Sequence, residues 1–170
     1  YVLTVSAELE TFSPLPADPP ARLHPYTSEA AGLNYLLYVP GEYGVDPKRQ
    51  WPLLIYLHGL DRASAASVLV LQGDHPLRPL VDQDYFPFIV VAPKASGEYE
   101  IWATDGMVAA VMTLVDEIQS ALAVDHDRVY LTGASAGGNG AWAIGLRHPD
   151  RFAALAPVMG YATWPWAVPE

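Results

Sequence analysis

The feature that most constrains the fold of this chain is the Gly-Ala-Ser-Ala-Gly run at residues 133–137, directly after an apolar strand predicted at residues 128–132. Glycines two residues on either side of a serine are typical of a sharp turn from a strand into a helix. Such a turn holds its central residue, Ser135, in a strained backbone conformation and lifts the hydroxyl above the sheet. A helical stretch predicted at residues 141–147 completes the pattern. A glycine-rich helix start that packs tightly and makes no use of the hydroxyl is the structural alternative.

The residues around Ser135 have separate expected roles. Gly133 and Gly137 support the turn, because a Cβ at either position would collide with the neighbouring strand or helix. Ser135 would then stand at a helix N-terminus, where backbone N–H groups and the helix dipole favour negative charge. The N–H of Ala136 is the natural first donor to an oxyanion. The pattern therefore predicts a serine nucleophile.

A second signal follows the predicted strand at Trp51–Leu57, whose consecutive apolar residues indicate burial on both faces. The strand ends in His58-Gly59-Leu60, and the N–H of Leu60 is predicted to be the second oxyanion donor. Gly59 would support that loop, and His58 would fix it rather than act as a base. A His-Gly pair is weak by itself and depends on the turn at Ser135 for its meaning.

Apolar stretches elsewhere predict a sheet of five or six strands. They lie at residues 34–39, 51–57, 88–92, 128–132 and 152–159, with an opening edge strand at residues 1–9. Prolines between residues 14 and 25 predict an irregular surface connection. The clearest helix, with Asp105 as its N-cap, has apolar residues at the helical period from 108 to 122. Strands that alternate with helices pair in parallel, so we expect a single α/β domain over residues 1–170, built as a three-layer α/β/α sandwich.

Charge and composition exclude several classes of function. The formal net charge of −10 argues against a nucleic acid or an anionic membrane as partner. With no cysteine, the chain has no disulfide, no Cys-ligated metal and no thiol nucleophile. No apolar stretch reaches the roughly 20 residues of a membrane span. The chain starts at Tyr1 rather than Met, so we expect the natural N-terminus to lie outside it, and a secreted or periplasmic location is favoured over a cytoplasmic one.

The segments quoted above carry a resemblance. The stretches 125–142 and 147–158, together with 86–93, 51–59 and 34–40, resemble the α/β-hydrolase superfamily. Within it they are most similar to the phospholipase/carboxylesterase group, which includes feruloyl-esterase-like, polyhydroxybutyrate-depolymerase-like and predicted-peptidase-like proteins. The resemblance covers about residues 30 to 160 and implies that Ser135 is the nucleophile, with Ala136 and Leu60 as oxyanion donors. The chain departs from the group at Leu60-Asp61-Arg62, where members often have a small residue, a glycine and an acid, and at Asn139, where an aromatic residue or a histidine is common.

The sequence does not provide a complete catalytic triad. In this fold the acid and the histidine follow the nucleophile in chain order. After Ser135 come one histidine, His148, and two acids, Asp150 and Glu170. His148 lies thirteen residues further along a mostly helical path, about 20 Å at 1.5 Å per residue, so it does not reach the hydroxyl. We therefore expect the fold to be truncated after its sixth strand, with the acid and the base on later segments.

The remaining histidines, His24, His75 and His126, are most simply loop residues, and no pair of histidines has metal-ligand spacing. No cofactor is predicted. The aromatic residues near the end, Tyr161 and Trp164-Pro-Trp166, fit a tail that covers a strand edge better than a ligand-binding wall. Trp102 and Trp142 are expected in the core.

The favoured function is a serine hydrolase of carboxylic esters, acting on a small or polymer-derived ester through an acyl-enzyme on Ser135. Two alternatives stay open. A catalytically inactive scaffold or binding module would explain the missing base and acid. A serine peptidase would use the same acyl-transfer chemistry with a different leaving group. The oligomeric state, the natural substrate and the acyl or alcohol preference are not encoded in recognisable motifs.

Overall fold

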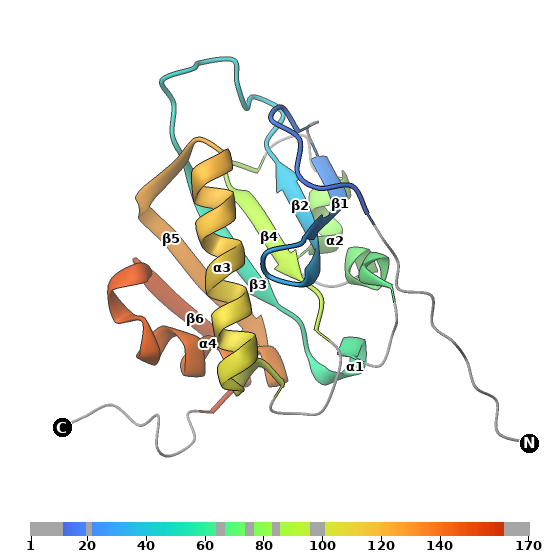
Figure 1. The fold of residues 1–170 in the computed structure, drawn as a ribbon, viewed down its shortest axis with the longest axis vertical. Coiled ribbons are helices and arrows are strands. Elements are labelled where there is room, and N and C mark those ends of the chain that lie inside the picture. Colours follow the sequence, from blue (N-terminus) through green and yellow to red (C-terminus); the bar gives the residue numbers. More distant parts are fainter. Residues whose placement is uncertain are drawn as a thin grey trace, which may run out of the picture.

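The computed structural model describes residues 12–19, 22–63, 67–73, 77–82, 86–95 and 101–161. Within these ranges six strands form one mixed sheet in the order β1-β2-β4-β3-β5-β6 (Figure 1). The strands are β1 (Arg22–Ser28), β2 (Leu33–Val39), β3 (Trp51–Leu57), β4 (Ile89–Pro93), β5 (Val124–Ala134) and β6 (Ala154–Val158). Strands β4, β3, β5 and β6 run parallel to one another, whereas β1 and β2 are joined as an antiparallel pair at one side. The predicted α/β class and mostly parallel sheet are confirmed.

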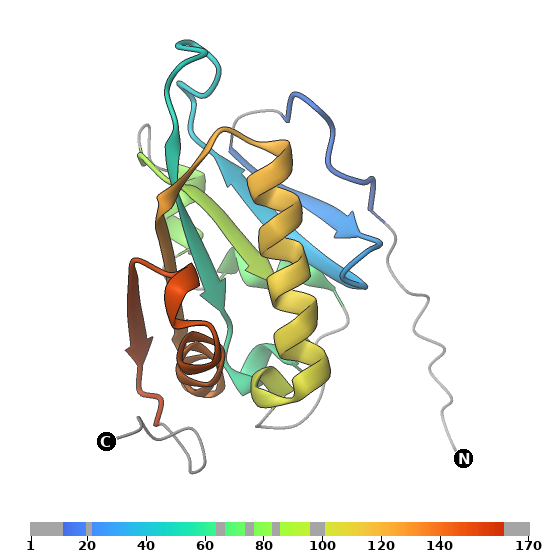
Figure 2. The ribbon, with the colours of Figure 1, turned by 60° about the vertical axis from the view of Figure 1, so that its left-hand side comes forward.

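Helices cover both faces of the sheet because the strand side chains alternate between them. Tyr35, Leu37 and Ile55 point to the face covered by α3 (Asp105–Ala121) and α4 (Ala136–Arg147). The alternate strand residues, such as Leu36 and Tyr38, point to the opposite face and pack against the short helices η1 (Val68–Gly73) and α2 (Leu77–Asp82). Figures 1 and 2 show α3 lying along one face with α4 beside it. The molecule is therefore the expected three-layer sandwich.

Three short helical segments connect these layers near the strand ends. They are α1 (Leu60–Ala63), η2 (Ile101–Ala103) and η3 (Pro149–Arg151). The segment α1 directly follows the end of β3, and η2 precedes α3. Two of the three, α1 and η2, therefore lie next to the carboxyl edge of the parallel strands.

Residues 12–19 have no regular structure, as predicted around the prolines, but the prediction is wrong at Pro25. Pro25 lies within β1, where it pairs in register with Leu36 of β2. Among the described residues β1 is an edge strand, and an edge is where a sheet tolerates a residue without an N–H. His24 consequently lies in a strand rather than in a loop. The predicted strand at residues 1–9 falls outside the described residues.

Two boundaries also differ from those predicted. The N-cap of α3 is Thr104 rather than Asp105, because the Thr104 side chain accepts a hydrogen bond from the Met107 N–H. Residues 125–127, which include the predicted loop residue His126, continue β5 towards its start at Val124, which pairs with Trp51. There Arg128 donates to Asp125 at 2.6 Å, and this hydrogen bond lowers the pKa of the Asp125 carboxyl. His126 is thus an exposed strand residue.

Among the described helices, none combines the length and apolar character that crossing a membrane requires.

Candidate active site

Ser135 occupies the junction between β5 and α4, at the carboxyl edge of the parallel strands. Its backbone has φ 55° and ψ −117°, a conformation that residues with a Cβ rarely adopt. The Ser135 N–H donates to the Val158 carbonyl at 2.9 Å, and the Ser135 carbonyl accepts from Asn139 N–H at 3.1 Å. Although Ser135 is the N-cap of α4, its side chain makes no capping hydrogen bond. The hydroxyl is therefore not used to begin the helix.

The glycines on either side allow the close approach that this turn needs. A Cβ on Gly133 would lie under 3 Å from backbone atoms of Gly137 and Leu57. A Cβ on Gly137 would also lie under 3 Å from backbone atoms of Leu57 and His58, and closer than the Cβ on Gly133. The first turn of α4 thus packs directly on the end of β3, which leaves no space for a side chain at either position.

The loop that follows β3 lies beside Ser135. Leu57 pairs in register with Gly133, so the chain after Leu57 runs next to the turn after β5. An ideal Cβ on Gly59 would be 3.7 Å from Ser135 Cβ. Leu60 begins α1 just after Gly59, and Ala136 begins α4 just after Ser135. Backbone N–H groups in the first turn of a helix have no acceptor within that helix, so both predicted donors have the right type of position.

His58 is buried and uses both ring nitrogens to hold this loop. Its Nδ1–H donates to the Gly59 carbonyl at 2.7 Å, while Nε2 accepts from the Ala95 N–H at 3.0 Å. An Nε2 that accepts a backbone N–H carries no proton, so the imidazole is neutral. His58 therefore ties the end of β3 to the chain after β4, and this arrangement does not leave a nitrogen for taking a proton from Ser135.

The other described histidines lie far from Ser135. His24 lies in β1, and three strands separate β1 from β5. The distance between β1 and β5 across the sheet is therefore about 19 Å, at 4.8 Å per strand-to-strand step. His126 is nine residues before Ser135 in β5, about 30 Å at 3.3 Å per residue. His148 lies beyond the C-terminus of α4, about 18 Å from its start. His75 lies outside the described residues. The described residues thus supply no histidine base for Ser135.

Asn139 and the chain after β6 close the site on another side. The Asn139 side chain is buried, and its Oδ1 accepts from the Tyr161 N–H at 2.8 Å. A Cβ on Gly160 would lie under 3 Å from backbone atoms of Gly138 and Asn139. The departure at position 139 thus has a structural role, since the asparagine anchors residues 158–161 over the first turn of α4. Of the predicted aromatic tail, Tyr161 is exposed, and Trp164 and Trp166 lie outside the described residues.

Two residues near the carboxyl edge of the parallel strands are not among the site residues predicted from the sequence. Lys94 follows β4 and is buried, donating to the Ala95 carbonyl at 2.6 Å, and burial lowers the pKa of its ammonium. Trp102, predicted as a core residue, is buried and donates from its indole N–H to the His58 carbonyl at 3.0 Å. The sequence shows that Lys94 follows a strand and that Trp102 precedes a helix. It does not show which residues they contact, because those contacts depend on how the segments pack.

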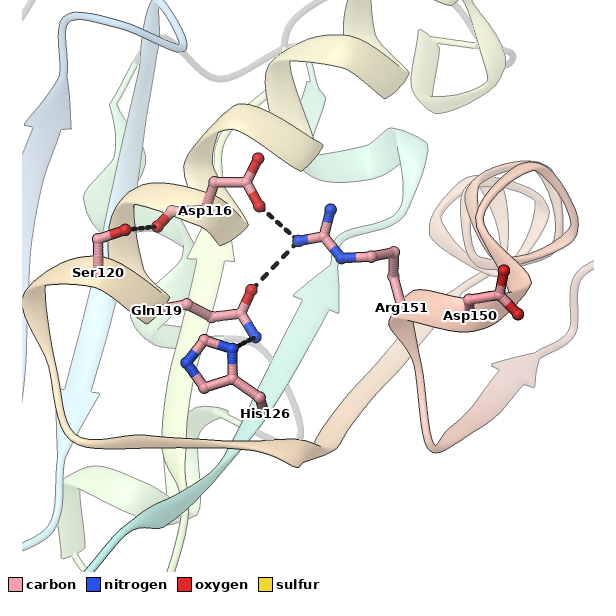
Figure 3. A pocket seen from close by; sticks show the side chains of 6 residues that line it. All are labelled: Asp116, Gln119, Ser120, His126, Asp150 and Arg151. Carbon is pink, nitrogen blue, oxygen red and sulfur yellow. Dashed lines mark hydrogen bonds and ion pairs between the residues drawn. The ribbon is translucent and has the colours of Figure 1, made fainter.

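A separate polar cavity of about 430 Å³ opens at the other end of the strands. Figure 3 shows Arg151 reaching from η3 to Asp116 and Gln119 of α3, with His126 against Gln119. The cavity is also lined by Ser120 and Asp150. It lies by the start of β5 and of β6, whereas ligands of parallel α/β sheets bind at the carboxyl ends of the strands. The residues around Ser135 are therefore the stronger candidate for catalysis.

The chain is similar to known hydrolases in sequence. Residues 102–166 match a family model described as the prolyl oligopeptidase family. A bifunctional acetylxylan esterase/xylanase from Neocallimastix patriciarum is 27% identical over 134 residues, covering 78% of this chain and 18% of that protein. The chain thus spans about a fifth of the curated relative that it matches.

Solved structures are similar over most of this chain. A thermostable esterase has a TM-score of 0.60 at 23% identity, covering 83% of this chain and 41% of that one. An acetyl xylan esterase from Aspergillus awamori has a TM-score of 0.60 at 20% identity, covering 79% and 50%. An S-formylglutathione hydrolase from Staphylococcus aureus has a TM-score of 0.60 at 18% identity, covering 86% and 62%. The chain spans 41% to 62% of these structures, and the likeness establishes a shared fold.

Proposed function

Because this chain has the α/β-hydrolase fold, we propose that it carries the nucleophile of a serine hydrolase that acts on carboxylic esters. The observation that carries the proposal is the backbone of Ser135, held at φ 55° at the end of β5 with a hydroxyl that does not cap α4. A turn of this kind presents a nucleophile at the carboxyl edge of the sheet. The esterase names of the relatives support an ester substrate.

The proposed reaction begins when Ser135 Oγ attacks the ester carbonyl carbon and its proton passes to a general base. As the attack proceeds, negative charge develops on the carbonyl oxygen. The N–H groups of Leu60 and Ala136 donate hydrogen bonds to this oxyanion. The alkoxy group then leaves with a proton, and water hydrolyses the acyl-enzyme to the acid and free Ser135. The base is supplied from outside the described residues, since His58 is neutral and fully engaged.

Positions 58, 59, 133 and 137 support this chemistry. His58 and Gly59 hold the Leu60 segment against Ser135, and Gly133 and Gly137 allow the turn itself. Esters attached to polysaccharides are the favoured class of substrate, because the curated relative is named as an acetylxylan esterase/xylanase. A secreted or periplasmic location would suit a polymer substrate and stays a prediction, to be checked by fractionating the producing cells.

The proposal is tested with a fluorophosphonate and with a p-nitrophenyl ester on the intact protein. We expect the fluorophosphonate to label Ser135, and Ser135→Ala to abolish labelling and lower turnover at least about 10⁴-fold. Ser120→Ala is the matched control, because Ser120 is an exposed serine of α3 whose hydroxyl only donates to the Asp116 carbonyl. Undiminished turnover in Ser135→Ala would refute the proposal.

The match to the prolyl oligopeptidase family favours one alternative, a serine peptidase. The same nucleophile would then attack an amide, and the two functions differ in leaving group. Parallel assays with p-nitrophenyl acetate and with a prolyl p-nitroanilide separate them. We expect kcat/KM to be higher for the ester by at least about 100-fold, and the reverse order would favour the peptidase. An inactive scaffold is indicated if neither substrate is turned over and Ser135 is not labelled.

A further inference from the structure

Trp102 lies between the two segments that would provide the oxyanion donors. It is 1% exposed and belongs to η2, the short helical segment before α3. Its indole N–H donates to the His58 carbonyl at 3.0 Å, and its ring packs edge-on against the His58 imidazole with the centroids 5.0 Å apart. On its other side the Trp102 side chain meets α4, where a Cβ on Gly140 would come under 3 Å from Trp102 Cβ and Cγ.

These contacts join two parts of the chain that are otherwise separate in sequence. Leu60 stands two residues after His58, and Ala136 stands four residues before Gly140, in the first turn of the same helix. An oxyanion is held only when both donors lie within hydrogen-bond distance of one oxygen atom, so their spacing must be correct to a few tenths of an ångström. A rigid aromatic side chain that contacts both segments can set that spacing.

We propose that Trp102 is a positioning residue that fixes the Leu60 segment relative to the start of α4 and so sets the geometry of the oxyanion hole. The inference rests on the proposed function and adds a residue from a third segment to the site. Trp102 acts through His58 and Gly140 and does not itself touch the reacting atoms. Its hydrogen bond to the His58 carbonyl is the contact that a smaller apolar core residue would lack.

The expected consequence is a loss in the transition state rather than in substrate binding. The carbonyl oxygen gains most of its negative charge only after the attack, so misplaced donors weaken the transition state more than the bound ester. Removing one oxyanion donor lowers kcat by about 10²–10³-fold, so a displaced donor is expected to cost about tenfold. KM should stay within about twofold of its original value.

The experiment measures kcat, KM and inhibitor affinity in the intact protein and in two variants at position 102. Trp102→Phe keeps an aromatic ring against His58 but lacks the N–H donor. Replacing Trp102 by the isosteric analogue β-(3-benzothienyl)alanine keeps the full shape and removes only the donor. A trifluoromethyl ketone, which forms a tetrahedral oxyanion on the nucleophile, reports the hole directly. We expect kcat and the affinity of this ketone to fall by the same factor, about tenfold, in both variants.

Trp51→Phe is the matched control. Trp51 is equally buried, at 1% exposure, but it lies at the start of β3, at the opposite end of that strand from His58. Its replacement should lower the melting temperature as much as Trp102→Phe does, with kcat and ketone affinity unchanged. Fluorescence and circular dichroism check that all variants are folded before kinetics.

Two results would overturn the inference. Unchanged kcat and ketone affinity in the folded benzothienylalanine protein would show that the hydrogen bond to His58 positions nothing. Equal losses in Trp51→Phe would show that any buried tryptophan has the same general effect. A failure of the proposed function would be recognised separately. In that case Ser135→Ala would keep the esterase activity of the intact protein, whatever the effect of the variants at position 102.

Discussion

At the scale of single residues, the backbone of Ser135 has a cost that its neighbours offset. A non-glycine residue at φ 55° and ψ −117° is strained by about 1–3 kcal/mol. Two backbone hydrogen bonds secure it, one from its N–H to the Val158 carbonyl and one from the Asn139 N–H to its own carbonyl. The strained turn persists because strand β6 and helix α4 hold it from two sides. Strain of this kind is retained where a side chain must be presented in a defined direction.

The glycine at position 137 gives a prediction on stability. We expect Gly137→Ala to destabilise the protein by at least about 3 kcal/mol, because the new Cβ would overlap backbone atoms of Leu57 and His58, which cannot rotate away as a side chain can. Chemical denaturation of the intact protein measures the change in the free energy of unfolding.

Gly106→Ala is the control for that substitution. Gly106 is the second residue of α3, and no heavy atom lies within 4 Å of where its Cβ would be. Alanine is the better helix former by about 0.5–1 kcal/mol, so this variant should be as stable as the wild type or slightly more so. A Gly137→Ala protein as stable as Gly106→Ala would contradict the close packing of α4 on β3.

At the scale of elements, α4 shows how packing overrides helix propensity. Its first turns contain Gly137, Gly138 and Gly140, each about 1 kcal/mol less favourable than alanine in a helix. Propensity accordingly predicts a helix only over residues 141–147, whereas the structure begins it at Ala136. The glycines bring the helix against β3, the chain after β6 and Trp102, and those contacts compensate for the weak propensity.

The N-terminus of α3 gives the prediction at this scale. Thr104→Ala should destabilise the protein by about 1 kcal/mol, because the Thr104 hydroxyl accepts a hydrogen bond from the Met107 N–H that alanine cannot replace. Thermal and urea unfolding, followed by circular dichroism, measure the change.

The same helix contains a matched threonine. Thr113 lies in the middle of α3, and its hydroxyl donates back to the Ala109 carbonyl. Such a bond adds little, and alanine has the higher helix propensity, so Thr113→Ala should be neutral or stabilising by up to about 0.7 kcal/mol. Equal effects at positions 104 and 113 would argue against Thr104 as the cap.

At the scale of the whole molecule, the net charge of −10 makes stability sensitive to ionic strength. Self-repulsion of a surplus of like charges destabilises the compact state. The ion pairs Glu42–Arg49 and Asp125–Arg128 are partly exposed to solvent, and surface ion pairs contribute little to stability. Repulsion should therefore outweigh attraction at low ionic strength.

We expect the melting temperature to rise when sodium chloride is increased from 10 mM to 300 mM at pH 7. Over this range the screening length falls from about 30 Å to below about 10 Å, so repulsion between distant carboxylates is removed first. Differential scanning calorimetry measures the shift, and choline chloride at the same ionic strength controls for specific binding of sodium. A melting temperature that falls with salt would show that the ion pairs dominate instead.

Local patterns in the sequence were sufficient for part of this molecule. The strand at Trp51–Leu57 has the same bounds as predicted, and those at residues 34–39 and 88–92 shift by one residue or gain one. The glycine spacing around Ser135 also predicted the strand–turn–helix junction, because a turn this sharp needs particular residue types close together in the chain. Steric requirements between residues close together in the chain can therefore be predicted from the sequence.

Only the tertiary structure decided the arrangement around that turn. Pro25 was predicted to belong to an irregular surface connection and instead lies in β1, because the edge position makes its missing N–H harmless. The Ala95 N–H that donates to His58, the Asn139 contact to Tyr161 and the place of Trp102 between two segments all join residues far apart in the chain. A single sequence contains no pattern that specifies such pairs, since they depend on which strands become neighbours in the sheet.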